Sequence, residues 1–185
     1  MRAAIEREGD GHRAALRGDP AGATAAYGRA IEAYRASWEA APPNAYGRLV
    51  GLLKAAVLCG AAAEDAAYVR AAISNEDAAG SPTAAYARAV AALVAGDDAE
   101  AARHAAVMRG GSEPFGRAAV AIDALARGDA AAYREALTAI VHDFESRDEH
   151  LTGVAFADTA AMLETLAAPR GMAARPASAV LAPLA

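Results

Sequence analysis

The sequence predicts an all-α fold: an array of antiparallel helical hairpins, about nine helices in all, with an extended C-terminal tail. Alanine makes up close to a third of the 185 residues, and alanine is the best helix former and a poor strand former. Runs of β-branched and aromatic residues that alternate with polar ones, the usual strand signal, do not occur in the sequence. The length suits one all-helical domain, residues 1–185, with a core that needs no disulfide or metal.

A repeated pair of helix signals supports the hairpins. The stretches "SPTAAYARAVAALVAGDD" and "SEPFGRAAVAIDALARGDA" each run from a proline to a Gly–Asp turn, and both their prolines and their glycines lie 32 residues apart. Proline is tolerated in a first helical turn, glycine supplies the left-handed residue that ends a helix, and aspartate caps the next one. We therefore expect helices over 82–95 and 114–127, each followed by a second helix, capped by Asp97 or Asp98 and by Asp129.

The remaining elements are predicted from the same kinds of signal. A third Gly–Asp turn at residues 18–19 separates the first two helices, and Pro42–Pro43 breaks the chain after them. Asn44 is expected to cap the third helix. The predicted ranges are 2–17, 20–40, 44–59, 62–78, 129–148 and 152–168. Hairpins then occupy about 1–148, a closing helix about 152–168 and a docked tail 169–185.

Composition and charge exclude several classes of function. The net charge is −5 with both signs spread along the chain, so the basic stripe of a nucleic-acid-binding protein is missing. No apolar stretch reaches the roughly 18 residues that cross a bilayer, so a membrane protein is not expected. The charged N-terminus lacks a signal core, and a single cysteine, Cys59, fits a reducing compartment. The expected location is the cytoplasm.

Catalytic motifs are missing from the sequence. No phosphate-binding glycine loop and no nucleophile elbow are present. Cys59 has no neighbouring histidine or aspartate to activate it and is expected to be buried and inert. His12 and His104 are isolated in sequence and are expected on helix surfaces. The prediction is therefore a protein that is not an enzyme and that holds no cofactor.

The densest polar stretch is "HDFESRDEH", residues 142–150. On one helix, His142, Glu145 and Glu149 would project from the same side, and such a set could bind a metal ion. Metal sites of this kind need a matching set on a facing helix, and no other predicted helix carries one, so no metal site is expected. Instead, Phe144 is expected in the core and Arg147 in a local ion pair, at a charged helix end that can bind a partner.

Aromatic residues offer a second recognition surface. Tyr27, Ile31, Tyr34 and Trp38 follow helical spacing, which favours core packing of that helix. Other tyrosines fall on successive helices with arginines near them in sequence, an arrangement that would suit acidic partners. The predicted partner-binding residues are Tyr46, Arg48, Tyr86, Arg88, His142, Glu145, Arg147 and Glu149.

Two family resemblances accompany these patterns. The period, the small residues at the hairpin crossings and the Gly–Asp turns over residues 12–148 resemble tetratricopeptide repeats, although the tryptophan, leucine–glycine and tyrosine signature is missing. This resemblance implies a stacked helical array. In residues 142–183, "HDFESRDEH", "GVAFADTAAMLETLAAPRGM" and "SAVLAP" resemble the closing elements of bacterial immunity protein 49, which implies a protein that neutralises a toxin partner.

The predicted function is non-enzymatic recognition of a partner protein or peptide through a groove of the helical array, in the form of an immunity-type protein if the second resemblance holds. The alternative is a small-molecule-binding protein or an enzyme with a site among the helices near His142–His150. That alternative needs a cavity, and we expect an alanine-rich interior to close up. A deep pocket with inward histidine or glutamate would favour it. The sequence leaves the oligomeric state open.

Overall fold

The computed structural model describes residues 1–182, and all regular structure in that range is helical. The all-α prediction is confirmed. None of the helices in this range is long and apolar enough to cross a membrane. The elements are α1 (Arg2–Leu16), α2 (Pro20–Glu39), α3 (Gly47–Cys59), α4 (Ala63–Ala72), α5 (Asn75–Gly80), α6 (Pro82–Ala95), α7 (Asp98–Met108), α8 (Glu113–Arg127), α9 (Ala130–Glu145), α10 (Asp158–Ala167) and a 3-10 helix (Ala168–Arg170).

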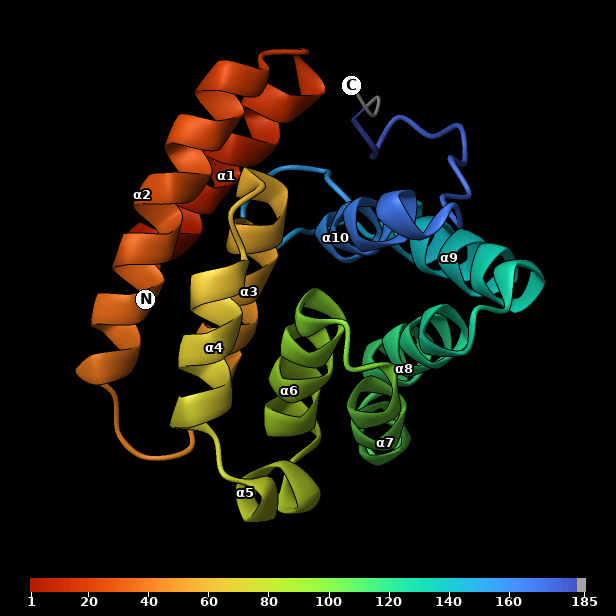
Figure 1. Ribbon diagram of the computed structural model, residues 1–185. Coiled ribbons are helices and arrows are strands. Elements are labelled where there is room, and N and C mark those ends of the chain that lie inside the picture. The colour runs from red at the N-terminus through yellow and green to blue at the C-terminus, as the bar shows by residue number, and fades with distance from the viewer. Residues whose placement is uncertain (183–185) are drawn as a thin grey trace.

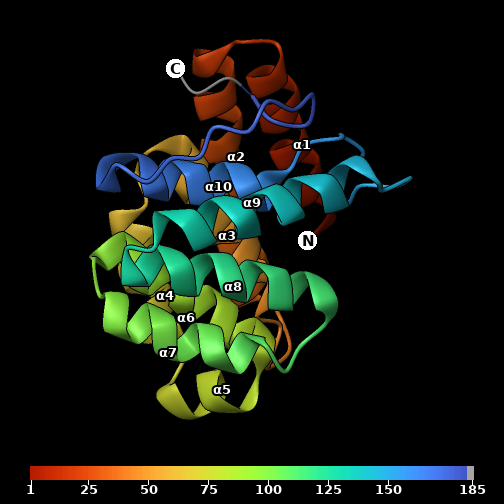
Figure 2. The same ribbon diagram turned by 90° about the vertical axis from the view of Figure 1, so that its right-hand side faces the viewer.

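The helices form a curved array whose last helix returns to its middle. Neighbours in the chain pack on one another from α1 to α3 and again from α6 to α9. Figure 2 shows α7, α8, α9 and α10 stacked in successive layers. α10 packs on α3 and also contacts α8 and α9, so it lies between the first and second halves of the array (Figure 1). Side chains from both halves therefore meet on the inner side of the array.

The Gly–Asp turns are formed as predicted. Gly96 and Gly128 adopt the left-handed conformation, with φ of 75° and 71°. The Asp97 carboxylate accepts from the Glu100 backbone N–H at 3.0 Å, and Asp129 caps α9 in the same way, also at 3.0 Å. These two turns set the ends of the α6–α7 and α8–α9 hairpins.

Two helix boundaries in the first half differ from the prediction. The expected helix over 62–78 is broken at Ile73, which is extended, and α5 starts anew after Ser74. The cause is a capping box in which the Ser74 hydroxyl accepts from the Asp77 backbone N–H and the Asp77 side chain accepts from the Ser74 N–H. Asn44 has a positive φ of 68° and lies outside α3, so the prediction that it caps this helix is wrong.

The C-terminal elements are shorter than predicted. α9 ends at Glu145, and the helix expected from Thr152 starts only at Asp158. Residues 146–157 form a loop, in which Gly153 has a φ of 68°. The tail is docked up to residue 182: the Ala157 N–H, for example, donates to the Val180 carbonyl at 2.8 Å. The predicted tail residues 183–185 lie outside the described residues.

Close helix packing places two tyrosine rings in the interior. A Cβ atom on Gly11 of α1 would lie 2.5 Å from the Tyr27 ring, and one on Gly51 of α3 would lie 2.5 Å from the Tyr34 ring. Real Cβ atoms do not approach so closely, so any larger residue at either position would have to displace the buried ring. Tyr27 and Tyr34 are buried, as the helical spacing predicts, and the Tyr34 hydroxyl reaches a buried carboxylate on α1.

Candidate functional site

Two of the predicted partner-binding residues hold the start of α3 in place. Tyr46 is buried, and its ring lies 5.8 Å from the Trp38 ring, centroid to centroid. Arg48 is half-buried and donates to the Ser37 carbonyl near the end of α2. Both side chains are used in joining α2 to α3.

Arg88 is also buried, and its hydrogen bonds are internal. Its guanidinium donates to the carbonyls of Arg70 and Ile73, both at 2.9 Å, and to Asn75 Oδ1 at 2.8 Å. It also pairs with the buried Glu100 carboxylate of α7. Arg88 therefore satisfies the C-terminal carbonyls of α4 and fixes α6 to α7, which is a structural role rather than a partner surface.

The two histidines expected on helix surfaces are buried, so that expectation is wrong. His12 is 1% exposed and His104 is 4% exposed. Each faces a glutamate four residues earlier on its own helix: His12 Nε2 lies 4.0 Å from Glu8 Oε1, and His104 Nε2 lies 3.4 Å from Glu100 Oε1. The i, i+4 spacing places each pair on one helix face, and that face is turned to the interior.

The polar stretch at residues 142–150 does not form one helical face. His142 and Glu145 are exposed on α9, and Glu149 is exposed in the loop that follows. Glu145 Oε1 accepts from the Ser178 hydroxyl of the tail at 2.6 Å. The prediction that His142, Glu145 and Glu149 share one helical face is wrong, because α9 ends at Glu145.

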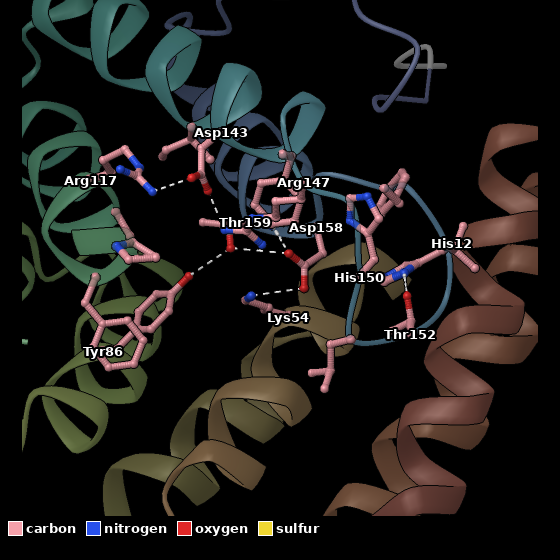
Figure 3. A pocket seen from close by; sticks show the side chains of 18 residues that line it. His12, Lys54, Tyr86, Arg117, Asp143, Arg147, His150, Thr152, Asp158 and Thr159 are labelled. Atoms are coloured by element: carbon pink, nitrogen blue, oxygen red, sulfur yellow. Dashed lines mark hydrogen bonds and ion pairs between the residues drawn. The ribbon is translucent and has the colours of Figure 1, made fainter. Parts of the chain in front are cut away.

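A cavity of about 180 Å³ lies on the inner side of the array. The expectation that the alanine-rich interior closes up is therefore wrong. Its walls come from α1, α3, α6, α8, α9, α10 and the loop over 146–157 (Figure 3). The polar side chains that line it are His12, Lys54, Tyr86, Arg117, Asp143, Arg147, His150, Thr152, Asp158 and Thr159. Of the predicted site residues, Tyr86 and Arg147 lie here.

An ion pair lines one side of the cavity. Lys54 Nζ of α3 lies 3.0 Å from Asp158 Oδ2, although the two residues are 104 positions apart in the chain. Their side chains are 15% and 17% exposed. Asp158 Oδ1 accepts from the Thr159 backbone N–H at 2.6 Å, and Lys54 Nζ lies 5.9 Å from the centroid of the Tyr86 ring. The packing of α10 on α3 creates this pair.

Two arginines share one carboxylate on another part of the wall. Arg117 Nη2 of α8 lies 2.5 Å from Asp143 Oδ1, and Arg147 pairs with the other oxygen of the same carboxylate. The Arg147 guanidinium also stacks on the Phe144 ring at 3.9 Å. Leu151, from the loop after α9, lines the cavity and is 75% exposed.

A cluster of the buried Glu8 and His12 with the half-buried Asp158 adjoins the ion pair. One ligand-type atom of each residue lies within 4.8 Å of the others. The Tyr34 hydroxyl donates to Glu8 Oε2 at 2.6 Å, and His12 Nδ1 lies 3.1 Å from the Thr152 hydroxyl. His12 and Asp158 line the cavity, whereas Glu8 lies among the buried side chains next to them.

Burial shifts the titration of this cluster. Desolvation, with the nearby Asp158 charge, raises the pKa of Glu8 to about 7. Desolvation also lowers the pKa of His12 to about 4, so the imidazole is neutral near pH 7. Burial alone would lower the pKa of Lys54, but the attraction of Asp158, Tyr86 and Glu8, together with the hydrogen bond to Asp158, outweighs it and raises that pKa. Lys54 in turn keeps the pKa of Asp158 low against the effect of burial.

A larger cavity, of about 670 Å³, lies between α2, α10 and the tail. Phe156 lines both cavities and stacks on His12, with 4.5 Å between ring centroids. The one carboxylate on the wall of the larger cavity, Glu164, is already bonded to the Tyr133 hydroxyl and to backbone N–H groups of the tail. Among the described residues, the paired charges face the smaller cavity, which is the better candidate site.

Sequence reasoning missed most of this site. Lys54 is the single lysine of the chain and interrupts an apolar helix. That isolation was the one sequence signal that could have pointed to Lys54 as a site residue. The Glu8–His12 spacing was visible, but nothing in the sequence shows that this side of α1 is covered. Asp158 could not be found, because its position depends on the return of α10 to α3.

Comparisons with protein-family models, curated proteins and solved structures find no match for this chain. The interpretation of the site therefore depends on its geometry and chemistry alone.

Proposed function

We propose that the protein binds a small molecule with an acidic group in the cavity of about 180 Å³. The observation that carries this proposal is the charge of the wall. Three basic side chains, Lys54, Arg117 and Arg147, face two carboxylates, Asp143 and Asp158. Basic side chains outnumber carboxylates on the wall itself, although Arg117 also pairs with Glu113, outside the wall, at 2.5 Å. The site is partly enclosed, and electrostatic attraction there is stronger than in water.

The donors of the wall suit a carboxylate or phosphate. An ammonium group has three N–H donors, and Lys54 uses one of them on Asp158. Arginine guanidinium groups bind carboxylate and phosphate oxygens through paired donors. The cavity holds about six water molecules by volume, which is room for a small acid. The proposal is binding, and it assigns no reaction.

A panel of acids tests this function. Acetate, succinate, glutamate and inorganic phosphate would be added to the protein in buffer freed of metal by a chelating resin, and binding followed by thermal shift and calorimetry. We expect a saturable rise in Tm with at least one acid, lost in Lys54→Met and reduced in Arg147→Gln. Arg127→Gln serves as the control, because Arg127 is exposed and away from the cavity. No shift with any acid, or equal shifts in all variants, would contradict the proposal.

A second candidate is recognition of a partner protein at the same place, the function predicted from the sequence. The exposed Leu151 favours it, because an apolar side chain at a charged cavity is suited to a protein interface. An acidic side chain or C-terminus of the partner would then enter the cavity. If the resemblance to immunity protein 49 holds, the partner is a toxin and the protein acts in the cytoplasm.

The variant Leu151→Asn, which adds no charge to the cavity wall, separates the two candidates. A free acid should bind this variant as it binds the unmodified chain, since the Leu151 side chain is apolar and 75% exposed and gives the acid no polar contact. A partner protein that packs on Leu151 should lose at least about 2 kcal/mol, or about thirtyfold in Kd. If a toxin is encoded beside this chain, that toxin mixed with the two forms provides the assay, and equal binding to both would contradict the partner candidate.

A further inference from the structure

Three potential ligand atoms meet in the interior next to the cavity. Glu8 and His12 project from one face of α1, and Asp158 is the first residue of α10. A carboxylate oxygen of each acid and a ring nitrogen of His12 lie within 4.8 Å of one another. Among residues 1–182, no other such group of histidine, cysteine and acidic side chains comes together.

The side chains of Glu8 and His12 are oriented by hydrogen bonds to the atoms that face away from the cluster. The Tyr34 hydroxyl holds Glu8 Oε2 at 2.6 Å, and the Thr152 hydroxyl holds His12 Nδ1 at 3.1 Å. These contacts leave Glu8 Oε1 and His12 Nε2 directed at each other, 4.0 Å apart. Outer hydrogen bonds of this kind fix the ring orientation and tautomer of metal-binding histidines.

The His12 ring nitrogen on the inner side is buried without a partner. His12 is 1% exposed, and Nε2 has no hydrogen-bond partner within the described part of the chain. A buried polar atom without a partner costs about 1–3 kcal/mol and calls for an explanation. A bound ion would satisfy this atom.

We propose that Glu8, His12 and Asp158 bind one divalent transition-metal ion of the Zn²⁺ or Mn²⁺ type. One imidazole nitrogen with two carboxylates suits these ions, whereas Mg²⁺ and Ca²⁺ prefer ligand sets made only of oxygen. The two charges of the ion match the two carboxylates. This site goes beyond the proposed binding of an acid, and its ion would add positive charge beside the cavity.

Lys54 limits the affinity of the site. Its ammonium group lies 3.0 Å from Asp158 Oδ2 and competes with the ion for this carboxylate. The cations that act on the His12 ring are Arg13 and Lys54, and the acidic groups beside it are Asp158 and Glu8. We therefore expect moderate affinity, and tighter binding once the lysine is neutralised.

The chain contains a matched control for this site. Glu100 and His104 of α7 have the same spacing and similar burial, but Glu100 is paired with Arg70 and Arg88. Two guanidinium groups already pair with the Glu100 carboxylate and neutralise it. No ion is expected at that pair.

Titration calorimetry with ZnCl₂ on the full chain, without any acid ligand, tests the site. We expect one Zn²⁺ per chain, an affinity at least about a hundredfold weaker in His12→Phe, and an unchanged affinity in His104→Phe. Phenylalanine keeps the ring contacts in both variants while removing the ligand atom. Circular dichroism would establish that each variant is folded.

A milder variant covers the case in which His12→Phe does not fold. Thr152→Val removes only the outer partner of His12 and should weaken Zn²⁺ binding about tenfold. Absence of saturable binding, or equal Zn²⁺ affinity in the unmodified chain and in both the Thr152 and His12 variants, would overturn the metal site. Because no acid is present, this result is independent of the proposed ligand binding.

Discussion

The same pair of residues, a glutamate followed four positions later by a histidine, occurs on α1 and on α7 with opposite surroundings. Glu100 and His104 lie against two arginines, and the Arg70 Nη2 atom is 2.5 Å from Glu100 Oε2. Glu8 and His12 lie against a second carboxylate, Asp158. Both pairs are buried.

The difference separates a structural cluster from a functional one. Around Glu100 the charges are balanced, because Arg70 also pairs with Asp97, at 3.6 Å, and Arg88 satisfies backbone carbonyls as well as the Glu100 carboxylate. Around Glu8 two carboxylates share the single charge of Lys54, and the only hydrogen bond to Glu8 comes, among the described residues, from Tyr34. Buried groups with unbalanced charge destabilise a fold, and they concentrate at functional sites.

The largest expected effect is at the balanced cluster. Arg88→Met leaves the Glu100 carboxylate without its closest partner and the α4 carbonyls without donors. Removing one member of a buried ion pair costs about 3–5 kcal/mol. Urea unfolding should show a loss of this size, with acid binding at the cavity unchanged. A loss below about 1 kcal/mol would contradict the structural role.

The opposite sign is expected at Glu8. The folded pKa of about 7 lies above the unfolded value of 4.5, so the stability that Glu8 contributes is fully present below pH 4.5 and is lost as the pH rises through 7. Glu8→Gln avoids this loss and keeps an acceptor for Tyr34. It should raise the free energy of unfolding by about 3 kcal/mol at pH 8, and by less than about 1 kcal/mol at pH 5.

Urea unfolding of metal-free protein at the two pH values measures this effect. Glu100→Gln is the matched variant, and it should destabilise the protein at both pH values because it unbalances Arg70 and Arg88. If Glu8→Gln also destabilised the protein at pH 8, the account of an uncompensated carboxylate would be wrong.

A smaller effect is expected from the lysine that competes with the ion. Lys54→Met removes a positive charge 3.0 Å from Asp158, so Zn²⁺ binding should tighten by at least about tenfold, equivalent to about 1.4 kcal/mol. The same change abolishes binding of the acid. Calorimetry of the variant with each ligand separately shows whether the two affinities move in opposite directions, and weaker Zn²⁺ binding would refute the competition.

The smallest effect is expected at the junction of α4 and α5. Ser74→Ala removes the cap that starts α5, close to Asn75, which Arg88 contacts. Loss of a cap costs about 1 kcal/mol. Thermal unfolding should show this loss. Zn²⁺ and acid binding should stay unchanged, because Ser74 lies near the Glu100 cluster and does not line the cavity. Altered Zn²⁺ affinity would show that the two regions are coupled.

The sequence predicted the helices wherever a local signal determines them. Gly96, Gly128 and their following aspartates end and start helices by local hydrogen bonds, and these turns were found. The Ser74–Asp77 capping box was equally local and was overlooked. The start of α10 at Asp158 could not be predicted from residues 152–168, because the loop before it is held by contacts with the tail and α1.

The site was much harder to predict, because it depends on which helix faces are covered. His12 and His104 were expected at the surface, since their sequence neighbours are arginines. His12 is buried because α2 packs on α1, and His104 is buried because α6 packs on α7. Arg147 was predicted to pair locally and does pair with Asp143, but its place on the cavity wall requires the neighbouring helix α8.

An anomalous difference map from crystals soaked in ZnCl₂, recorded at the zinc edge, tests the contrast between the two Glu–His pairs most directly. The account predicts one strong peak, about 2.0–2.2 Å from Glu8 Oε1 and His12 Nε2, and none between Glu100 and His104. A peak at the Glu100–His104 pair, or no peak at either pair, would contradict it.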